Sequence, residues 1–327
     1  MRRLLATTAA LALATTLAAC GGDGSDDSSS GGGGGGSDEV RSIRVGVIPI
    51  VDVAPIYLGV EQGFFEDRNI DVELVPGSGG AAAVPGVVSG DYDFSFGNVT
   101  SILLAGSEGL PLRVVANGVS STGDVATDFS AVVVPANSPI QSVADLEGKR
   151  VAVNNLKNIG EVTIRKGIED AGGDPSNVEF LELPFPEMPA AVAGGNVDAA
   201  WVVEPFVTVA TGQGARAIFY PFAEPIEDLT VATYFTTEQV IQEDPDLVDD
   251  FQAAINESLE YANSNPDEVR RILLTYTQIP PAAAEQIRLP SWPQEVNWDS
   301  IETVAELMAD FGITEEPTDV DALKATD

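Results

Sequence analysis

The chain has 327 residues, and its 51 acidic residues against 16 basic ones give a formal net charge of −35. This excess of carboxylates makes nucleic acid and anionic membrane surfaces poor partners. It is typical of a salt-adapted host, where ions screen the repulsion between carboxylates. The chain contains one cysteine and no histidine. Imidazole general-base catalysis and the usual zinc sites are therefore excluded.

The N-terminus has the three parts of a secretory signal peptide: basic residues at positions 2 and 3, an apolar run over 4–17, and small residues before Cys20. The run is shorter than the about 20 residues that a membrane-spanning helix needs. Leu17-Ala18-Ala19-Cys20 resembles the lipobox of bacterial lipoproteins, in which the cysteine carries the lipid. We therefore expect residues 1–20 to be a lipoprotein signal peptide and the protein to be extracytoplasmic, lipid-anchored to the outer face of the cell membrane. In the alternative, Cys20 is a small residue of an ordinary signal peptide.

A segment of Gly, Ser and Asp follows and includes six consecutive glycines at 31–36. Such a composition cannot bury apolar surface, so we expect residues 21–41 to be a flexible linker. The remaining chain, about 285 residues, is long enough for two lobes.

Two stretches about 106 residues apart carry the same succession of predicted strands and helices. The first stretch predicts a strand over 43–48, a helix over 54–62, a strand over 70–75, a helix over 81–89 and a strand over 93–96. The second predicts a strand over 150–153, a helix over 160–171, a strand over 178–183, a helix over 188–193 and a strand over 197–203. This alternation indicates two βαβαβ units, each a parallel sheet covered by helices on both faces. We expect an α/β protein of two such lobes.

Two apolar, β-branched runs at 130–135 and 230–237 lie between the elements of one unit and the other, and we interpret them as hinge strands. The predicted first lobe therefore consists of residues 42–129 and 230–327, and the second lobe of residues 130–229. Ligands of open α/β sheets bind outside the carboxyl ends of the strands. If those ends face each other, the two lobes form a clamp.

The C-terminal part has helical spacing. Apolar residues recur every four positions from Leu247 to Leu259, which places them on one helix face. Asn265 and Pro266 are typical of an N-cap and a first helical position, and Glu268 would complete a capping box. These helices are interpreted as scaffold rather than site.

The order and spacing of several short motifs resemble one family, the substrate-binding proteins of ABC importers for nitrate, sulfonates, taurine and pyrimidine precursors. The motifs are Ala54-Pro55-Ile56-Tyr57, Gly63-Phe64-Phe65, Gly77-Ser78-Gly79-Gly80, Ser89-Gly90-Asp91-Tyr92-Asp93, Leu146-Glu147-Gly148-Lys149-Arg150-Val151-Ala152-Val153, Val197-Asp198-Ala199-Ala200-Trp201 and Glu204-Pro205-Phe206. The resemblance implies a periplasmic-binding-protein type II fold, related to that of thiamine-pyrimidine synthases, which closes on a small ligand and passes it to ABC permease subunits. Two departures are Pro85, which would kink the second helix, and Asn69, where the family often has glycine.

The glycine-rich turn at Gly77, Ser78 and Gly79 follows a strand and opens a helix, so its N–H groups and the helix dipole suit an anionic group. The alternative is an ordinary strand-to-helix turn. We interpret Asn154, Asn155, Lys157 and Asn158 as the equivalent turn of the second lobe, which adds amides and a cation. Lys157 is either a partner of an anionic ligand or a solvated side chain.

Further candidates lie at the ends of other predicted elements. Glu204 follows the last strand of the second unit, where its carboxylate would either meet a ligand amine or serve as an ion pair or cap. Asn98 and Thr100 follow the third strand of the first unit. The remaining candidates are Pro55, Tyr57, Phe206 and Met188, the last of which lies in a proline-rich turn that also contains Phe185. The aromatic residues Tyr57, Phe185, Trp201 and Phe206 form either the wall of an apolar pocket or part of the core.

We predict a solute-binding lipoprotein that captures a sulfonate or taurine-like ligand, acts as a monomer and needs no cofactor or metal. Two helix N-termini and Lys157 would hold the anionic head, and Glu204 the amine. A pyrimidine stacked on an aromatic residue is the alternative, and a site without strong cations would favour it. An enzyme is disfavoured because the chain has no histidine and its cysteine is assigned to lipidation. A ligand sensor that uses the same clamp is a further alternative.

Overall fold

The structure is a computed structural model that describes residues 40–325. The predicted signal peptide, the lipidation residue Cys20 and residues 21–39 of the predicted linker lie outside the described residues. Within residues 40–325, no helix combines the length and the apolar character that crossing a membrane requires.

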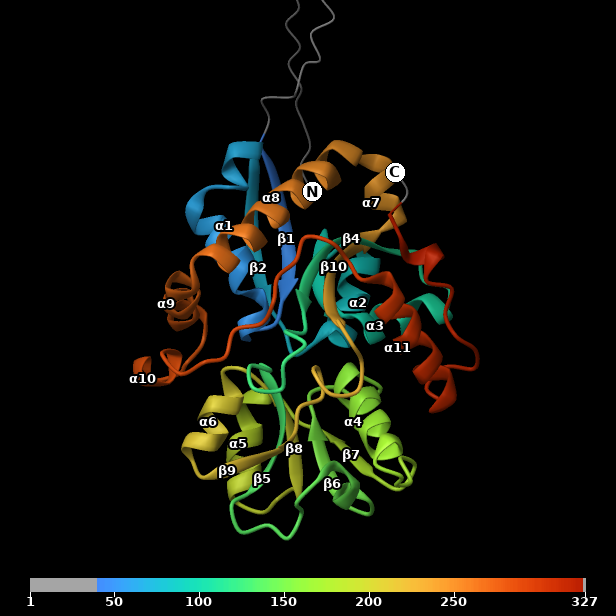
Figure 1. Ribbon diagram of the computed structural model, residues 1–327. Helices are drawn as coiled ribbons and strands as arrows, with labels where there is room; N and C mark the ends of the chain where they lie inside the picture. The colour runs from blue at the N-terminus through green and yellow to red at the C-terminus, as the bar shows by residue number, and fades with distance from the viewer. Residues whose placement is uncertain (1–39, 326–327) are drawn as a thin grey trace, which may run out of the picture. The chain divides into compact units, whose positions relative to one another are not determined.

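Two five-stranded mixed sheets form the centres of two lobes (Figure 1). Sheet 1 has the order β2 (Ile70–Pro76), β1 (Arg41–Val47), β3 (Phe94–Asn98), β10 (Thr230–Thr237) and β4 (Leu112–Ser120). Sheet 2 has the order β7 (Glu179–Glu182), β6 (Arg150–Val153), β8 (Ala199–Val203), β5 (Ser130–Pro135) and β9 (Ala215–Phe219). We call sheet 1 with its helices lobe 1 and sheet 2 with its helices lobe 2. The predicted α/β architecture is confirmed.

The two sheets have the same strand order, with β1, β2 and β3 equivalent to β6, β7 and β8. The strands β1 and β2 pair in parallel with register from Arg41 opposite Ile70 to Val47 opposite Pro76, and β6 and β7 pair in parallel as well. In each sheet the hinge strand, β10 or β5, is antiparallel to its neighbours. This topology corrects one interpretation: the turn at 154–158 follows β6 and is equivalent to the turn after β1, not to the glycine turn after β2.

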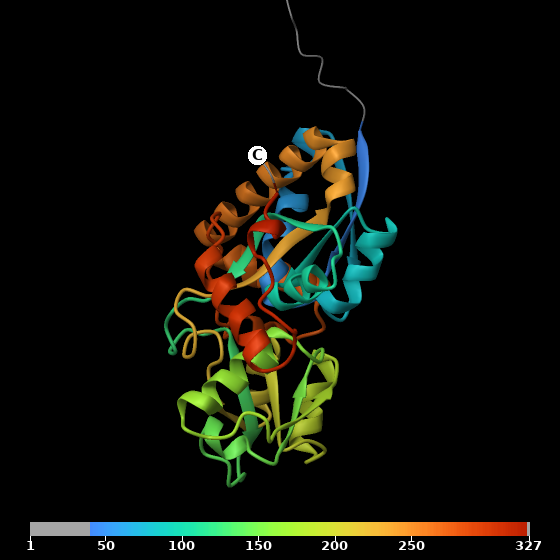
Figure 2. The same ribbon diagram turned by 90° about the vertical axis from the view of Figure 1, so that its right-hand side faces the viewer.

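Helices cover both sheets. In lobe 1 they are α1 (Ala54–Gln62), α2 (Gly80–Ser89), α3 (Val99–Ser107), α7 (Glu238–Glu243), α8 (Pro245–Ser264), α9 (Pro266–Tyr276), α10 (Pro281–Ala284) and α11 (Trp298–Asp310). In lobe 2 they are α4 (Ile159–Asp170), α5 (Met188–Ala193) and α6 (Phe206–Gly212). Helix α8 packs on α1 and β4, whereas α11 packs on α3 and also contacts α4 of lobe 2 (Figure 2). The apolar stripe predicted from Leu247 to Leu259 is buried.

The departures noted in the sequence are accommodated locally. Helix α2 continues through Pro85 to Ser89. Asn69 has a φ of 55°, a left-handed conformation that asparagine tolerates better than most residues. Asn265 is the N-cap of α9, but its side chain makes no capping bond and donates instead to the Tyr261 carbonyl at 2.8 Å. The predicted side-chain capping box is therefore wrong.

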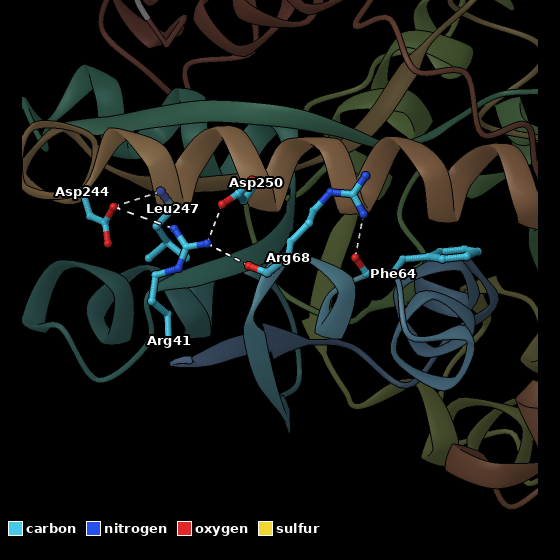
Figure 3. Close-up of polar contacts among 6 residues, drawn as sticks. All are labelled: Arg41, Phe64, Arg68, Asp244, Leu247 and Asp250. Atoms are coloured by element: carbon cyan, nitrogen blue, oxygen red, sulfur yellow. Dashed lines mark hydrogen bonds and ion pairs between the residues drawn. The ribbon is translucent and has the colours of Figure 1, made fainter. Parts of the chain in front are cut away.

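The start of β1 is fastened to α8 by polar contacts (Figure 3). The Arg41 guanidinium contacts Asp250 and donates to the Arg68 carbonyl at 2.9 Å. Arg68 in turn donates to the Phe64 carbonyl at 2.7 Å, and the Asp244 carboxylate caps α8 by accepting from the Leu247 N–H at 2.9 Å. These bonds hold the end of lobe 1 that is opposite the carboxyl ends of its parallel strands.

Candidate ligand-binding cleft

The carboxyl ends of the parallel strands of the two lobes face each other across a cavity of about 360 Å³. Its lining comes from both lobes and is mostly apolar: Ile48, Pro49, Ile50, Pro76, Gly77 and Ser78 from lobe 1, and Pro184, Phe185, Pro186 and Phe206 from lobe 2. Phe185 and Phe206 lie nearly parallel, with ring centroids 6.2 Å apart. None of the lining residues carries a charge, so the cavity suits an apolar face better than an ion.

Beside this cavity the glycine turn of lobe 1 contacts the asparagine turn of lobe 2. Asn154 Nδ2 donates to the Ser78 carbonyl at 3.2 Å. A Cβ at Gly79 would lie 1.8 Å from Asn155 Oδ1 and 2.9 Å from Asn154 Nδ2, so only glycine fits here. Two residues predicted for the site in lobe 1, Ser78 and Gly79, thus meet two predicted in lobe 2, Asn154 and Asn155.

The asparagine turn is buried and largely satisfied by itself. Asn158 Nδ2 donates to Asn154 Oδ1 at 3.0 Å, and the Asn158 side chain accepts from the Ile159 N–H at the start of α4. Asn155 is the exception, because its Oδ1 is buried without a hydrogen-bond partner. An unpaired buried acceptor costs stability, but Asn155 is not among the residues that line the cavity.

Glu204 is buried, and the contacts of its carboxylate match those of a cap. Oε2 accepts from the Thr208 N–H at 3.0 Å, and Oε1 accepts from the Thr208 hydroxyl at 2.9 Å and from the Arg288 N–H at 3.3 Å. Burial raises the pKa of Glu204, although these hydrogen bonds and the Arg288 charge oppose the shift. With both oxygens engaged, the structure favours the cap over the partner of a ligand amine.

The remaining predicted residues lie away from the cavity lining. Lys157, with a φ of 57°, lines a separate cavity of about 550 Å³ together with acidic residues such as Glu315 and Glu316. Asn98 and Thr100 are buried at the start of α3, and the Thr100 hydroxyl has no hydrogen-bond partner. Three others complete the set: Pro55 is buried in the first turn of α1, Tyr57 stacks on Tyr276 with centroids 3.9 Å apart, and Met188 is buried at the start of α5.

One ionisable group near the cleft was not singled out in the sequence. Asp52 lies in the turn between β1 and α1, four residues after Ile48 of the cavity lining, and is buried. Its Oδ2 has no hydrogen-bond partner, and desolvation raises the pKa of the carboxyl to about 8. Asp52 is therefore mostly a neutral acid at pH 7. Burial also raises the pKa of the nearby Tyr57 hydroxyl.

Sequence reasoning missed the lobe 1 part of the apolar lining, namely the run Ile48–Pro49–Ile50 and Pro76, whereas it did single out the proline-rich turn of lobe 2 that holds Pro184 and Pro186. A signal for them exists, because each lies at or just after the carboxyl end of a strand, where ligands of α/β sheets bind. Of the aromatic residues predicted as a possible pocket wall, Phe185 and Phe206 line the cavity.

A family model described as NMT1/THI5 like matches residues 50–269. The formylaminopyrimidine-binding protein of Halalkalibacterium halodurans is 25% identical over 225 residues, which cover 67% of this chain and 65% of that relative, slightly less than two thirds of its length. The alkanesulfonate-binding protein SsuA from Xanthomonas axonopodis pv. citri, solved bound to MOPS, has a TM-score of 0.76 at 20% identity and covers 88% of this chain and 99% of that one.

The nitrate-binding protein NrtA from Synechocystis PCC 6803 gives a TM-score of 0.72 at 15% identity, with 87% of this chain and 85% of that chain covered. At such identities the solved structures establish the fold, and the predicted periplasmic-binding-protein fold is confirmed. All three relatives are named as binding proteins. Because the family model matches more than half of the chain, the protein belongs to the NMT1/THI5-like family.

Proposed function

We propose that this protein is the extracytoplasmic solute-binding lipoprotein of an ABC importer, which captures a small organic ligand between its lobes and delivers it to the permease. Membership of the NMT1/THI5-like family supports the transport role. The position of the cavity supports capture between lobes, because residues of both lobes line it. A ligand that contacts the lining residues of both lobes binds the closed state more tightly than the open state. The difference between these two affinities sets how far it shifts the protein toward closure.

The observation that carries the ligand class is the apolar, uncharged lining of the cavity. The sequence favoured a sulfonate or taurine, held by Lys157 and Glu204. Lys157 lines another cavity and the Glu204 carboxylate is engaged with Thr208 and Arg288, so neither supports that ligand. A flat ring such as a pyrimidine fits better, because Phe206 offers an aromatic face and the rest of the lining carries no charge.

A sulfonate is the second candidate, and the start of α2 favours it. The helix α2 begins at Gly80 and runs for 10 residues, and it follows directly on the glycine turn, whose Gly77 and Ser78 line the cavity. N–H groups at a helix N-terminus bind anions without a charged side chain. The likeness to an alkanesulfonate-binding protein is in keeping with this candidate.

Thermal unfolding in the presence of candidate ligands tests the proposal. An aminopyrimidine at about 100 times its dissociation constant should stabilise the protein by about 2.7 kcal/mol, whereas methanesulfonate, taurine, nitrate and bicarbonate should give smaller shifts. Phe206→Ala should abolish the shift. Phe180→Ala is the matched control, because Phe180 is a half-buried phenylalanine of lobe 2 that packs under Arg165 and does not line the cavity.

The outcomes separate the two ligand classes. A shift with sulfonates alone would make the helix N-terminus the ligand contact and reject the pyrimidine. Equal losses in Phe206→Ala and Phe180→Ala would show that the aromatic face is not specific to the ligand. No shift with any of the compounds would overturn both ligand classes.

A further inference from the structure

Three segments run between or beside the two lobes. Residues 121–129 connect β4 to β5, residues 220–229 connect β9 to β10, and the segment between α10 and α11 passes both connections (Figure 1). We call these the first crossing, the second crossing and the C-terminal strap, the last defined as residues 285–297. Any rotation of one lobe against the other must bend the crossings, so side chains that join them control that rotation.

Arg288 of the strap contacts both crossings and the end of β8. Its Nη1 donates to the Asp128 carbonyl of the first crossing at 3.3 Å. Its guanidinium lies over the ring of Tyr220 in the second crossing, 5.4 Å from the centroid, in the geometry of a cation–π contact. Its N–H donates to Glu204 Oε1 at 3.3 Å. One residue therefore links three separate segments around the hinge.

The partners of Arg288 are themselves junctions between segments. The Asp128 carboxylate accepts from the Ser130 N–H at 2.9 Å in β5 and from the Ala223 N–H at 2.9 Å in the second crossing. Its carboxylate therefore joins the first crossing to the second. The Glu204 N–H donates to the Phe129 carbonyl at 2.8 Å, and the Glu204 carbonyl accepts from the Val51 N–H of lobe 1 at 2.9 Å.

The charge of Arg288 suits this position. Asp128 and Glu204 are both buried, and burial raises the pKa of each, to about 7 for Asp128. The Arg288 charge opposes the shift in both cases, and no other cation does so for either group among the described residues. Arg288 therefore stabilises two buried carboxylates that hold the crossings together. Its removal would weaken both junctions at once.

We propose that Arg288 is a positioning residue, a hinge clasp that holds the two crossings and the end of β8 in the arrangement in which the lobes meet, and so sets the fraction of closed protein. The proposal rests on the proposed function for its effect on ligand affinity, but not for its effect on the ligand-free protein. Arg288 does not line the cavity, so its effect on affinity is indirect. Affinity falls in proportion to the fraction of protein that is competent to bind.

The distance between the lobes in the ligand-free protein tests the proposal without any ligand. Replacing the one cysteine, Cys20, by serine leaves the full chain free of thiols, and spin labels on cysteines at Val88 of α2 and Glu169 of α4 then report one distance. Arg288→Gln should move the distance distribution to larger separations. Arg44→Gln is the matched control, because the Arg44 guanidinium lies 5.6 Å from the Tyr92 centroid within lobe 1.

A second variant guards against a general loss of structure. Tyr220→Leu removes the ring under the guanidinium but leaves the hydrogen bonds of Arg288 to the Asp128 carbonyl and to Glu204 Oε1. It should therefore shift the distance distribution in the same direction by a smaller amount. In both variants the melting temperature should stay well above the measuring temperature. With an aminopyrimidine or methanesulfonate as probe, whichever shifts the melting temperature, Arg288→Gln should raise the dissociation constant by about threefold to tenfold.

Unchanged distances in Arg288→Gln and Tyr220→Leu, or an equal change in Arg44→Gln, would overturn the clasp. Absence of binding by either probe would count against the proposed ligand classes and leave the distance result to decide on the clasp.

Discussion

The two lobes share one strand order but place opposite chemistry at equivalent turns. The turn after β1 is apolar and buries Asp52, whose Oδ2 has no hydrogen-bond partner. The equivalent turn after β6 buries asparagines that largely satisfy each other, as Asn158 does with Asn154 at 3.0 Å. The turn after β2 is glycine-rich, whereas its equivalent after β7 is rigid and rich in proline, with Phe185 buried at its centre.

This difference shows how a duplicated frame produces an asymmetric cleft. The contact across the lobes joins non-equivalent turns, the glycine turn of lobe 1 and the asparagine turn of lobe 2. Strand order fixes where the turns lie, because parallel strands bring their carboxyl ends to one edge. Side chains then decide which turn approaches closely, which forms a wall and which buries an ionisable group.

The largest effect is expected from replacing Asp52 by asparagine, which gives the first turn the neutral chemistry of the second. The pKa of Asp52 is about 8 in the folded protein, against 3.8 as its ordinary value. Between these values the folded state keeps a proton that the unfolded state has lost, so the free energy of unfolding falls as pH rises, by up to about 1.4 kcal/mol per pH unit. Asp52→Asn should remove the part of this fall that Asp52 causes, as measured by urea unfolding from pH 5 to 8, and leave the smaller part due to Asp128, whose pKa burial raises to about 7.

Asp198→Asn is the control for the sign of that effect. Hydrogen bonds from the Arg150 N–H and side chain lower the pKa of Asp198 in the folded protein. The carboxyl therefore has its ordinary pKa in the unfolded state and a lower one in the folded state. The stability due to its ionised form is lost only as pH falls through that acidic range. The control should therefore leave the slope between pH 5 and 8 unchanged. A slope in Asp52→Asn that is as steep as in the wild type would show that Asp52 is not the group that holds the proton.

A second comparison concerns how each hinge strand is held by its neighbour. In lobe 1, Phe96 of β3 packs edge-on against Tyr234 of β10, with centroids 5.5 Å apart. In lobe 2, Trp201 of β8 donates from Nε1 to the Ser130 hydroxyl of β5 at 2.8 Å. Ser130→Ala leaves a buried indole N–H unpaired, which should lower the free energy of unfolding in urea by about 1–3 kcal/mol.

Ser95→Ala is the matched control in lobe 1. The Ser95 hydroxyl donates to the carbonyls of Gly46 and Phe96, which belong to strands of sheet 1. Its removal leaves no buried donor unpaired and should cost less than Ser130→Ala. Equal losses would mean that the indole N–H finds another acceptor and that the bond does not hold β5 in place.

Much of the frame follows from local sequence signals. The ranges predicted for α1, α5, β5, β6 and β10 match the structure, because strong apolar periodicity and adjacent prolines or glycines mark their ends. The helices α3 and α6 and the strands β4 and β9 were not predicted. Helix α3 begins directly at Val99 after β3, with no intervening loop, and its run of Val, Thr, Ser and Ile lacks a strong helix former at the start.

The candidate site was predicted less well than the fold, for a physical reason. Residue type indicates which groups bind anions or amines, but it does not show whether those groups already have partners. Glu204 is engaged by Thr208 and Arg288, the latter 84 positions away, and Lys157 lies on another cavity. Such pairings depend on tertiary contacts far apart in sequence. The glycine turn was identified because its conformation and its place after a strand are local properties.

The smallest effect is expected at the contact between the glycine and asparagine turns. A methyl group at Gly79 would lie 1.8 Å from Asn155 Oδ1, so Gly79→Ala should oppose the approach of the lobes and weaken binding of the aminopyrimidine about tenfold in titration calorimetry, or about 1.4 kcal/mol. Gly77→Ala is the control, because a Cβ there meets only the Val47 carbonyl oxygen at 3.8 Å. Stability in urea should change little in Gly79→Ala, since the turn lies at the edge of its lobe. If both alanine variants bind alike, the close approach of these two turns is not part of the ligand-bound state.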